Sequence, residues 1–369
     1  MKKLLFICAA VILAASCNSG KHYTVKGNIT ADIPLAGRAY LFNSDRENTV
    51  RDTVKINEGQ FVFEGTVESP EMFYISLDGV DGLLQIFLEN DNYTISGTKD
   101  DFSNAVITGG ETQTKLNRYT EANNGLVEKY ALNDIIKEYG AEGTTEERKE
   151  EINAQFEEFN KESTALKDAI IAEDPVSHFA LMFLGSEYYY IPVDSLSDLV
   201  SAFKADPEFA GNRTLADIDG YLQKELSLMP GNKAVDFTLN DPEGNPVTFS
   251  EFYPKNKVTM IDFWASWCGP CRAFNPTLVE IYKKYQDKGF GIIGVSLDRD
   301  RDSWLKGIED DGLTWTHVSD LKFWQSEVAG LYNVNFIPQN TFVDAEGNII
   351  GRKVAEDELE AFLEEHLNK

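Results

Sequence analysis

The spacing of apolar residues along the chain changes twice, and each change marks a new kind of structure. In residues 23–110, short apolar runs alternate with turn residues about every ten positions, with no helical period between them. Such spacing is typical of an all-β sandwich or barrel of antiparallel strands. Residues 57–59 (Asn-Glu-Gly) and 90–92 (Asn-Asp-Asn) stand between runs of this kind, where hairpin turns are expected. We therefore predict an N-terminal all-β sandwich domain over residues 17–110.

A helical period replaces the strand pattern after residue 110. Apolar residues that recur three, four or seven positions apart form one stripe of a long helix, namely Ile152, Phe156, Phe159, Leu166 and Ile170. Thr144 and Glu147 have the spacing of a capping box at its start, and Asp174-Pro175 is expected to end it. Shorter helices are expected as far as Leu228, so residues 111–228 are predicted to be a central α-helical region.

A third pattern begins after residues 229–232 (Met-Pro-Gly-Asn), which resist regular structure and mark a boundary. Beyond them, strands alternate with helices, and a hairpin around Glu346-Gly347 precedes a final helix. The expected elements are strands over 257–264 and 291–297 and helices over 270–288 and 356–367. This order predicts a C-terminal α/β domain over residues 229–369, with a mixed sheet covered on both faces. The chain as a whole is thus expected to be multidomain.

Residues 1–16 are predicted to be a lipoprotein signal peptide. Two lysines precede residues 4–15, an uncharged aliphatic run too short to span a bilayer, which takes about 20 residues. The run ends in Leu-Ala-Ala-Ser before Cys17, which resembles the lipobox of bacterial lipoproteins, so Cys17 is expected to carry lipid and anchor the chain to the outer or inner membrane. Residues 18–20 (Asn-Ser-Gly) lack the acidic run associated with surface display, which favours the periplasmic face. The alternative is an ordinary secretory signal that leaves Cys17 free.

Composition excludes several classes of function. The 369 residues are 42% hydrophobic and 26% charged, which fits a globular chain and neither a disordered nor a polytopic membrane protein. Basic residues number 34 against 61 acidic ones, and the formal net charge of -27 repels nucleic-acid phosphates. We therefore expect no nucleic-acid partner. Four cysteines are too few for a disulfide scaffold, so the position of each one matters.

Cys268-Gly269-Pro270-Cys271 directly follows a predicted buried strand and opens a predicted helix. A thiol at a helix N-terminus faces free backbone N–H groups and the positive end of the helix dipole, which lowers its pKa and favours the thiolate. Gly269 permits a tight turn, and Pro270 suits the first helical turn, where its missing N–H costs nothing. Cys271 lies three residues later on the same helix face and can attack a mixed disulfide formed at Cys268. The pair is therefore predicted to cycle between dithiol and disulfide.

Three other uses of these two cysteines fit the sequence less well. A zinc site needs a second pair of ligands. With Cys17 expected to carry lipid, the mature chain offers no other free cysteine and no suitably spaced pair of histidines, so no metal is expected. A structural disulfide would close a loop of only two intervening residues and constrain the unfolded chain little. A peroxidatic cysteine usually follows a threonine by three residues, and this chain has Ala265 there. We expect no cofactor.

Residues 261–271 (IDFWASWCGPC) resemble the active-site segment of thioredoxin. Residues 291–298 (GIIGVSLD) and 336–350 (FIPQNTFVDAEGNII) resemble the membrane-anchored TlpA/ResA-like branch, and the resemblance covers residues 229–369. It implies a thiol:disulfide oxidoreductase with a thioredoxin-like fold. The first 110 residues resemble the β domain of unknown function that precedes thioredoxin modules in lipoproteins of Bacteroidota.

The resemblance also implies roles for residues around the cysteine pair. Ile337-Pro338 matches the cis-proline that faces the two cysteines and helps to hold a substrate backbone. Asp262, six residues before Cys268, matches the buried acid that carries the proton off Cys271, a role that requires a pKa raised by burial. Trp267 would shield Cys268 and shape the docking face.

Two positions depart from the family pattern. Gln339 follows the cis-proline where threonine is usual, and Asn335 stands near a position that often holds glycine, so we expect the substrate groove to differ. The dipeptide between the cysteines contains no histidine, which favours a reductase or isomerase over an oxidase.

The expected function is therefore that of a membrane-anchored periplasmic enzyme that reduces or exchanges protein disulfides. Its expected partners are disulfide-bearing envelope proteins and a transmembrane thiol reductant. Cytochrome c apoproteins, misoxidised proteins and a dedicated client all fit as substrates. The alternative is a binding or scaffold lipoprotein of the cell envelope in which the thioredoxin fold is accessory.

Overall fold

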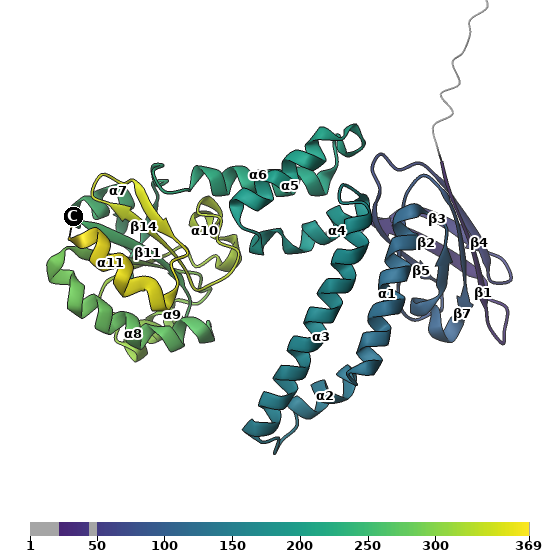
Figure 1. The fold of residues 1–369 in the computed structure, drawn as a ribbon, viewed down its shortest axis with the longest axis horizontal. Coiled ribbons are helices and arrows are strands. Elements are labelled where there is room, and N and C mark those ends of the chain that lie inside the picture. Colours follow the sequence, from purple (N-terminus) through teal and green to yellow (C-terminus); the bar gives the residue numbers. More distant parts are fainter. Residues whose placement is uncertain (1–21, 44–49, 369) are drawn as a thin grey trace, which may run out of the picture. The chain divides into compact units, whose positions relative to one another are not determined.

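A computed structural model describes residues 22–43 and 50–368, which form two compact units (Figure 1). The first unit contains the described residues up to Leu184 together with Glu208–Asn212, and the second contains Gly185–Pro207 together with the described residues from Arg213 onward. The helical region predicted over residues 111–228 is thus divided between the two units. The predicted signal peptide and Cys17 lie outside the described residues.

Two four-stranded sheets build the first unit, with strand orders β4-β1-β7-β8 and β3-β2-β5-β6. Both sheets contribute alternate side chains to one core, for example Val25 and Phe63 from one and Ile75 from the other. Glu58 and Gly59 have left-handed backbone, as a tight hairpin turn requires. The strands are β1 (Tyr23–Thr30), β2 (Gly37–Asn43), β3 (Val50–Ile56), β4 (Gln60–Gly65), β5 (Glu71–Leu77), β6 (Leu84–Leu88), β7 (Asn92–Thr98) and β8 (Val106–Thr108).

The predicted sandwich is confirmed, with one difference in strand direction. β1 pairs parallel with β7, whereas the turn pattern predicts antiparallel pairs throughout. A two-residue hairpin forces antiparallel pairing, but β7 reaches β1 only after five intervening strands, so no such constraint acts on this pair.

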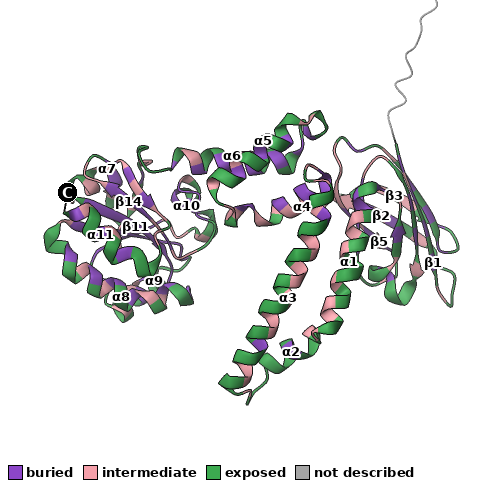
Figure 2. Ribbon diagram, in the orientation of Figure 1, coloured by how far each residue is buried: buried purple, intermediate pink, exposed green. Residues whose placement is uncertain are grey.

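The helices α1 (Glu111–Lys129) and α3 (Glu146–Glu173) lie side by side and are joined by α2 (Leu132–Tyr139) (Figure 1). Ile152 and Ile170 of the predicted apolar stripe are buried, and its three middle members are half-buried. Most of the α3 ribbon is exposed or intermediate (Figure 2). A hairpin of two long helices covers its apolar stripe from one side, which explains the partial burial.

The N-cap of α3 is Thr145, so the predicted cap at Thr144 was wrong. Thr145 has extended backbone, and its hydroxyl accepts the N–H of Arg148 at 3.2 Å. Thr144 instead donates its hydroxyl to the carbonyl of Glu138 at 2.6 Å, near the end of α2. The capping-box spacing misplaced the cap by one residue because the preceding helix already uses Thr144.

A mixed seven-stranded sheet with the order β10-β9-β13-β12-β11-β14-β15 forms the centre of the second unit. All seven residues of β11 (Val258–Trp264) are buried, and β11 pairs parallel with β12 and antiparallel with β14. Burial on both faces explains why apolar residues fill all but two of its positions, those of Thr259 and Asp262. The other elements are α4 (His178–Glu187), which spans the division between the units, α5 (Val193–Ala205), α6 (Arg213–Ser227), β9 (Thr238–Asn240), β10 (Pro246–Thr248), α7 (Phe249–Phe252), α8 (Gly269–Tyr285), β12 (Phe290–Ser296), α9 (Arg301–Asp311), β13 (Thr316–Ser319), α10 (Glu327–Leu331), β14 (Gln339–Asp344), β15 (Ile349–Arg352) and α11 (Leu359–Leu367).

The α/β architecture predicted for the C-terminal part is confirmed, and α6 packs against it. Glu225 of α6 is buried, and its Oε2 lies 3.0 Å from Arg352 Nη1 and 3.1 Å from Lys353 Nζ. Asn333 donates its side-chain N–H to Oε1 of the same carboxylate at 2.8 Å. These contacts join a helix that the sequence assigned to a separate region to the edge of the sheet, which is why the unit boundary does not fall at residue 228.

Candidate active site

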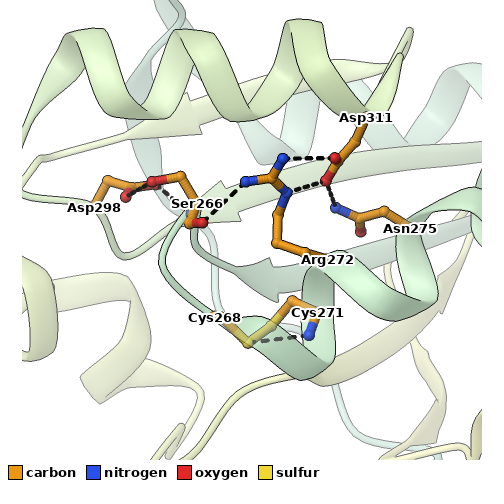
Figure 3. Close-up of a disulfide and its surroundings, with 7 residues drawn as sticks. All are labelled: Ser266, Cys268, Cys271, Arg272, Asn275, Asp298 and Asp311. Atoms are coloured by element: carbon orange, nitrogen blue, oxygen red, sulfur yellow. Dashed lines mark hydrogen bonds and ion pairs between the residues drawn. A yellow bond between two sulfur atoms is a disulfide. The ribbon is translucent and has the colours of Figure 1, made fainter.

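Cys268 and Cys271 form a disulfide at the N-terminus of α8, with an S–S distance of 2.01 Å and a Cα–Cα distance of 5.3 Å (Figure 3). Cys268 is the N-cap, and its sulfur accepts the backbone N–H of Cys271 at 3.2 Å. Gly269 and Pro270 occupy the first positions of the helix, where proline needs no N–H partner. Both cysteines are buried, at 4% and 2% exposure. The structure therefore contains the oxidised form of the predicted redox pair.

Asp262 of β11 lines a cavity of about 270 Å³ next to the cysteine helix. Phe274, one turn after Cys271 on α8, lines the same cavity, as does Pro338 of the cis Ile337-Pro338 bond. Asp262 is buried, and its Oδ2 has no hydrogen-bond partner among the described residues. This burial raises the pKa of Asp262 to about 7. The carboxyl can therefore both accept and release a proton near neutral pH.

Aromatic side chains lie on the surface beside the disulfide. Trp267 is 47% exposed, and its ring centre lies 5.1 Å from that of Phe323 and 6.1 Å from that of Trp324. The guanidinium of Arg299 lies 4.0 Å from the centre of the Phe323 ring. Phe323 has a φ of 58°, in the left-handed region that bulky residues rarely adopt. We call Trp267, Phe323 and Trp324 the aromatic face.

A polar network that the sequence analysis missed holds the loop before the disulfide (Figure 3). The buried carboxylate of Asp298 accepts the backbone N–H of Ser266 at 3.0 Å and its hydroxyl at 2.6 Å. Arg272 donates to the carbonyl of Ser266 at 3.1 Å and to both carboxylate oxygens of Asp311. Ser266 is thus held through its backbone and its side chain, two residues before the first cysteine.

The sequence contains a signal for part of this network. Asp298 directly follows the predicted strand 291–297 and lies two residues after the end of β12. The carboxyl ends of parallel strands such as β11 and β12 meet at one edge of a sheet. A polar residue at that position is therefore expected near the loop that follows β11. Asp311 has no such signal, because its contact with Arg272 depends on how α9 packs against α8.

The remaining predicted residues also have defined places. Ile337 is half-buried and packs against the core of the second unit. Gln339, noted as a departure from the family pattern, is buried and lines the cavity of Asp262, and neither polar atom of its side chain has a partner within the described part of the chain. Among the described residues, no group of three or more His, Cys, Asp or Glu is arranged to hold a metal ion.

The N-terminal and the C-terminal parts of the chain each match the model of a known protein family. Residues 230–352 match the model of the AhpC/TSA family, and residues 23–116 match a domain of unknown function, DUF4369. Thiol-disulfide oxidoreductase ResA of Bacillus cereus is 30% identical over 155 residues, which cover 41% of this chain and 83% of that protein. The chain belongs to the ResA family of thiol-disulfide oxidoreductases. ResA of Geobacillus kaustophilus is 29% identical over 147 residues, which cover 39% of this chain and 82% of that protein.

Solved structures similar to this ResA-family chain include two from Bacteroides species. The thioredoxin domain of a thiol-disulfide oxidoreductase from Bacteroides vulgatus is 35% identical, covers 38% of this chain and 100% of its own, and gives a TM-score of 0.36. A thiol-disulfide oxidoreductase from Bacteroides fragilis is 32% identical, covers 36% of this chain and 98% of its own, and gives a TM-score of 0.35.

The match to ResA confirms the predicted family, and with it the class of enzyme. This ResA-family oxidoreductase acts on disulfide-containing substrates. Within the described residues of the oxidoreductase, no helix is both long and apolar enough to cross a membrane.

Proposed function

We propose that this oxidoreductase reduces or exchanges disulfides of proteins in the cell envelope, from a lipid anchor at Cys17 on the periplasmic face. The observation that carries the redox part is the Cys268–Cys271 disulfide at the start of α8. The cavity lined by Asp262 and Pro338 next to α8 supports it. The leader sequence supports the anchor, since a short aliphatic run ends in small residues before Cys17.

The proposed reaction starts from the reduced pair. The thiolate of Cys268 attacks one sulfur of the client disulfide, and the first client cysteine leaves as a thiolate. Cys271 then loses its proton to Asp262 and attacks the sulfur of Cys268. The second client cysteine leaves, and the Cys268–Cys271 disulfide forms. Two electrons have passed to the client, and a thiol reductant in the membrane returns them to the enzyme by the same exchange in reverse.

The surface near the disulfide favours a polypeptide client. Aromatic residues are enriched at protein interfaces, and Trp267 and Trp324 of the aromatic face are 47% and 40% exposed. Pro338 is placed to hold the client backbone, as its match to the family's cis-proline implies. A small-molecule disulfide would need neither feature.

Trapping of the mixed disulfide tests this function. In the full chain, Cys271→Ser leaves Cys268 able to attack but removes the thiol that resolves the intermediate. Envelope proteins joined to this variant should appear as bands that vanish on reduction, and mass spectrometry identifies them. Cys268→Ser is the matched control and should trap none. If Cys271→Ser also traps none, the proposed function is wrong.

The anchor is tested separately. Cys17→Ala in the full chain removes the thiol that would carry the lipid. The variant should move from the membrane fraction to the soluble envelope fraction, while wild type stays with the membrane. Equal distribution of the two proteins would contradict the anchor and leave the redox proposal unaffected.

A further inference from the structure

We propose that a tyrosine-lined pocket on the second unit binds the client polypeptide at a distance from its reactive cysteine. The pocket has a volume of about 350 Å³ and is separate from the cavity of Asp262. Its lining includes Tyr189, Tyr190, Tyr221, Met229, Arg352 and Lys353, which we call the tyrosine pocket. The inference rests on the proposed function, because it names where a protein client is held.

Three tyrosines in succession have different roles at this pocket. Tyr188 to Tyr190 form one short 3-10 helix. Tyr188 is buried, and its ring lies 4.9 Å from that of Tyr221, so it packs this short helix against α6. The ring of Tyr189 lies 5.2 Å from Tyr221 at an angle of 87°, which is an edge-to-face contact. Tyr190, in contrast, is 80% exposed. Packing therefore accounts for the first two tyrosines and leaves Tyr190 unexplained.

The lining of the pocket includes an ion-pair group, one member of which has a donor without a partner among the described residues. Glu225, Arg352 and Lys353 form the ion-pair group that joins α6 to the sheet, in which the side chain of Glu225 is buried and that of Lys353 is 32% exposed. The side chain of Arg352 is 8% exposed, and its Nε has no hydrogen-bond partner among the described residues. A buried N–H group without a partner is unfavourable, and because Nε is itself covered in this structure, a ligand carbonyl oxygen would satisfy it once the Arg352 side chain turns toward the pocket.

Exposed apolar side chains of the second unit gather at the pocket and at the active site. Its described residues include six large hydrophobic side chains that are exposed. Trp267, Trp324 and Phe336 belong to the aromatic face or the cavity of Asp262, and Tyr190 and Met229 line the tyrosine pocket. The sixth, Leu199, lines neither. Concentration of exposed apolar surface at two places is typical of binding sites.

Lys353 lies between the active site and the tyrosine pocket, and its position indicates what the pocket binds. It lines the cavity of Asp262 and Pro338 as well as the tyrosine pocket. A client held at Pro338 by its backbone can therefore continue past Lys353 to the tyrosines. The occupant we assign is an extended segment of the client chain, with an apolar side chain against Tyr190 and Met229 and a backbone carbonyl toward Arg352.

Peptide disulfides of defined sequence test this assignment. Each peptide has one cysteine joined to thionitrobenzoate and either leucine or glycine at a chosen distance on either side of it. Attack by the pre-reduced full chain releases the peptide thiol and thionitrobenzoate and leaves the Cys268–Cys271 disulfide, so two electrons are accounted for. At one distance on one side, leucine should raise the second-order rate constant about tenfold over glycine.

The double variant Tyr190→Ala, Met229→Ala should abolish this preference. Leu199→Ala is the matched control, since Leu199 is equally an exposed apolar residue of the unit, at 38%, and it should keep the preference. All three proteins should react equally fast with 5,5′-dithiobis(2-nitrobenzoate), which is too small to reach the tyrosine pocket. Calorimetric binding of the same peptides with serine in place of cysteine measures the pocket without any redox step, and should show the same preference.

The outcomes separate the two proposals. If every peptide reacts at the same rate whatever its sequence, the tyrosine pocket does not bind the client, and the proposed function stands. If neither peptide nor small disulfide reacts, the proposed function fails. Binding of the serine peptides then decides by itself whether the tyrosine pocket binds a polypeptide. Equal binding of the leucine and glycine peptides would overturn the assignment of the tyrosine pocket.

Discussion

At the scale of single residues, Asp262 carries the proposed acid–base chemistry because nothing in its surroundings compensates for its burial. Its Oδ2 has no partner among the described residues, and burial alone raises its pKa to about 7. A salt bridge would have lowered that pKa and left a carboxylate too weak as a base to take a thiol proton. The missing partner is thus consistent with the proposed role in resolving the mixed disulfide.

Asp262→Asn should remove the pH dependence of the resolving step. In wild type, the rate of attack by Cys271 on a pre-formed mixed disulfide should rise with pH through an inflection near 7, where Asp262 loses its proton. The asparagine variant should be about tenfold slower at pH 7 and lack this inflection. Rapid mixing with a fluorescent mixed disulfide measures the step. Asp287→Asn, at an exposed position, is the matched control. Identical profiles for all three proteins would remove Asp262 from the mechanism.

Asp262 should also affect stability in a defined direction. Its pKa is higher in the folded chain than its ordinary value of 3.8, so between these pH values the folded chain holds a proton that the unfolded chain has released. The free energy of unfolding of the second unit should therefore fall as pH rises from 4 to 7. Asp262→Asn should flatten this slope in denaturant titrations, and an unchanged slope would contradict the raised pKa.

Asp298 positions the active-site loop, and its loss should slow the first attack. Asp298→Asn cannot accept both donors of Ser266, so about 1–3 kcal/mol of stability should be lost, together with a defined loop position. Attack of Cys268 on a small disulfide should slow about tenfold. Leu363→Ala, in α11, should cost about 2–5 kcal/mol without touching the loop. If Leu363→Ala slows the attack as much as Asp298→Asn does, then Asp298 acts through stability alone.

At the scale of elements, α6 shows how one buried carboxylate decides which domain a helix joins. Burial acts to raise the pKa of Glu225, but the charges of Arg352 and Lys353 and the hydrogen bond from Asn333 outweigh it, and the pKa is lowered. The same ion-pair group lines the tyrosine pocket. Apolar contacts alone would let α6 pack against the sheet in several positions. The ion pairs of Glu225 select one of them.

Glu225→Gln should destabilise the second unit by about 3–5 kcal/mol at pH 7, because it leaves the buried cation of Arg352 without its partner. A carboxyl whose pKa is lower in the folded chain stabilises the fold at pH values above its pKa in the unfolded chain. This contribution is lost as the pH falls through its pKa in the folded chain. The difference from wild type should therefore be full above about pH 5 and shrink in more acidic solution. Chemical denaturation at pH 7 and pH 3 measures it. A difference that does not change with pH would contradict the assigned ionisation.

At the scale of the whole molecule, all described residues assigned to the redox reaction belong to the second unit. The cysteine pair, the cavity of Asp262 and the tyrosine pocket are all built from residues of that unit. The sandwich has a separate core, which contains Phe63 and Phe73. Chemistry with a small disulfide should therefore not depend on the integrity of the sandwich.

Phe63→Ala tests this independence. Phe63 is fully buried, and its truncation should cost the sandwich about 3–5 kcal/mol. Limited proteolysis should then cut the first unit sooner, whereas the rate with 5,5′-dithiobis(2-nitrobenzoate) should equal that of wild type. Phe263→Ala, the same change in the core of the second unit, is the matched comparison and should reduce that rate. A fall in rate for Phe63→Ala would show that the sandwich supports catalysis.

Much of this organisation could be predicted from local patterns. The period of two in residues 23–29 predicted β1, the buried run ending at Trp264 predicted β11, and the cysteines between strand and helix predicted the redox pair. Each of these features depends on residues close together in the chain. The cap at Thr145 and the parallel β1–β7 pair were missed because a competing local partner or a distant strand decided them.

The sequence by itself determined the secondary structure of most of the chain and the chemistry of the two cysteines, because periodicity and helix-terminus electrostatics act within a few residues. The tertiary structure alone decided the surroundings of that chemistry. Asp298 reaches Ser266, Asp311 reaches Arg272, and Glu225 reaches Arg352 across 32, 39 and 127 positions of the chain. Such contacts depend on how strands and helices pack, and no local pattern records which charged residue will be left buried beside which partner.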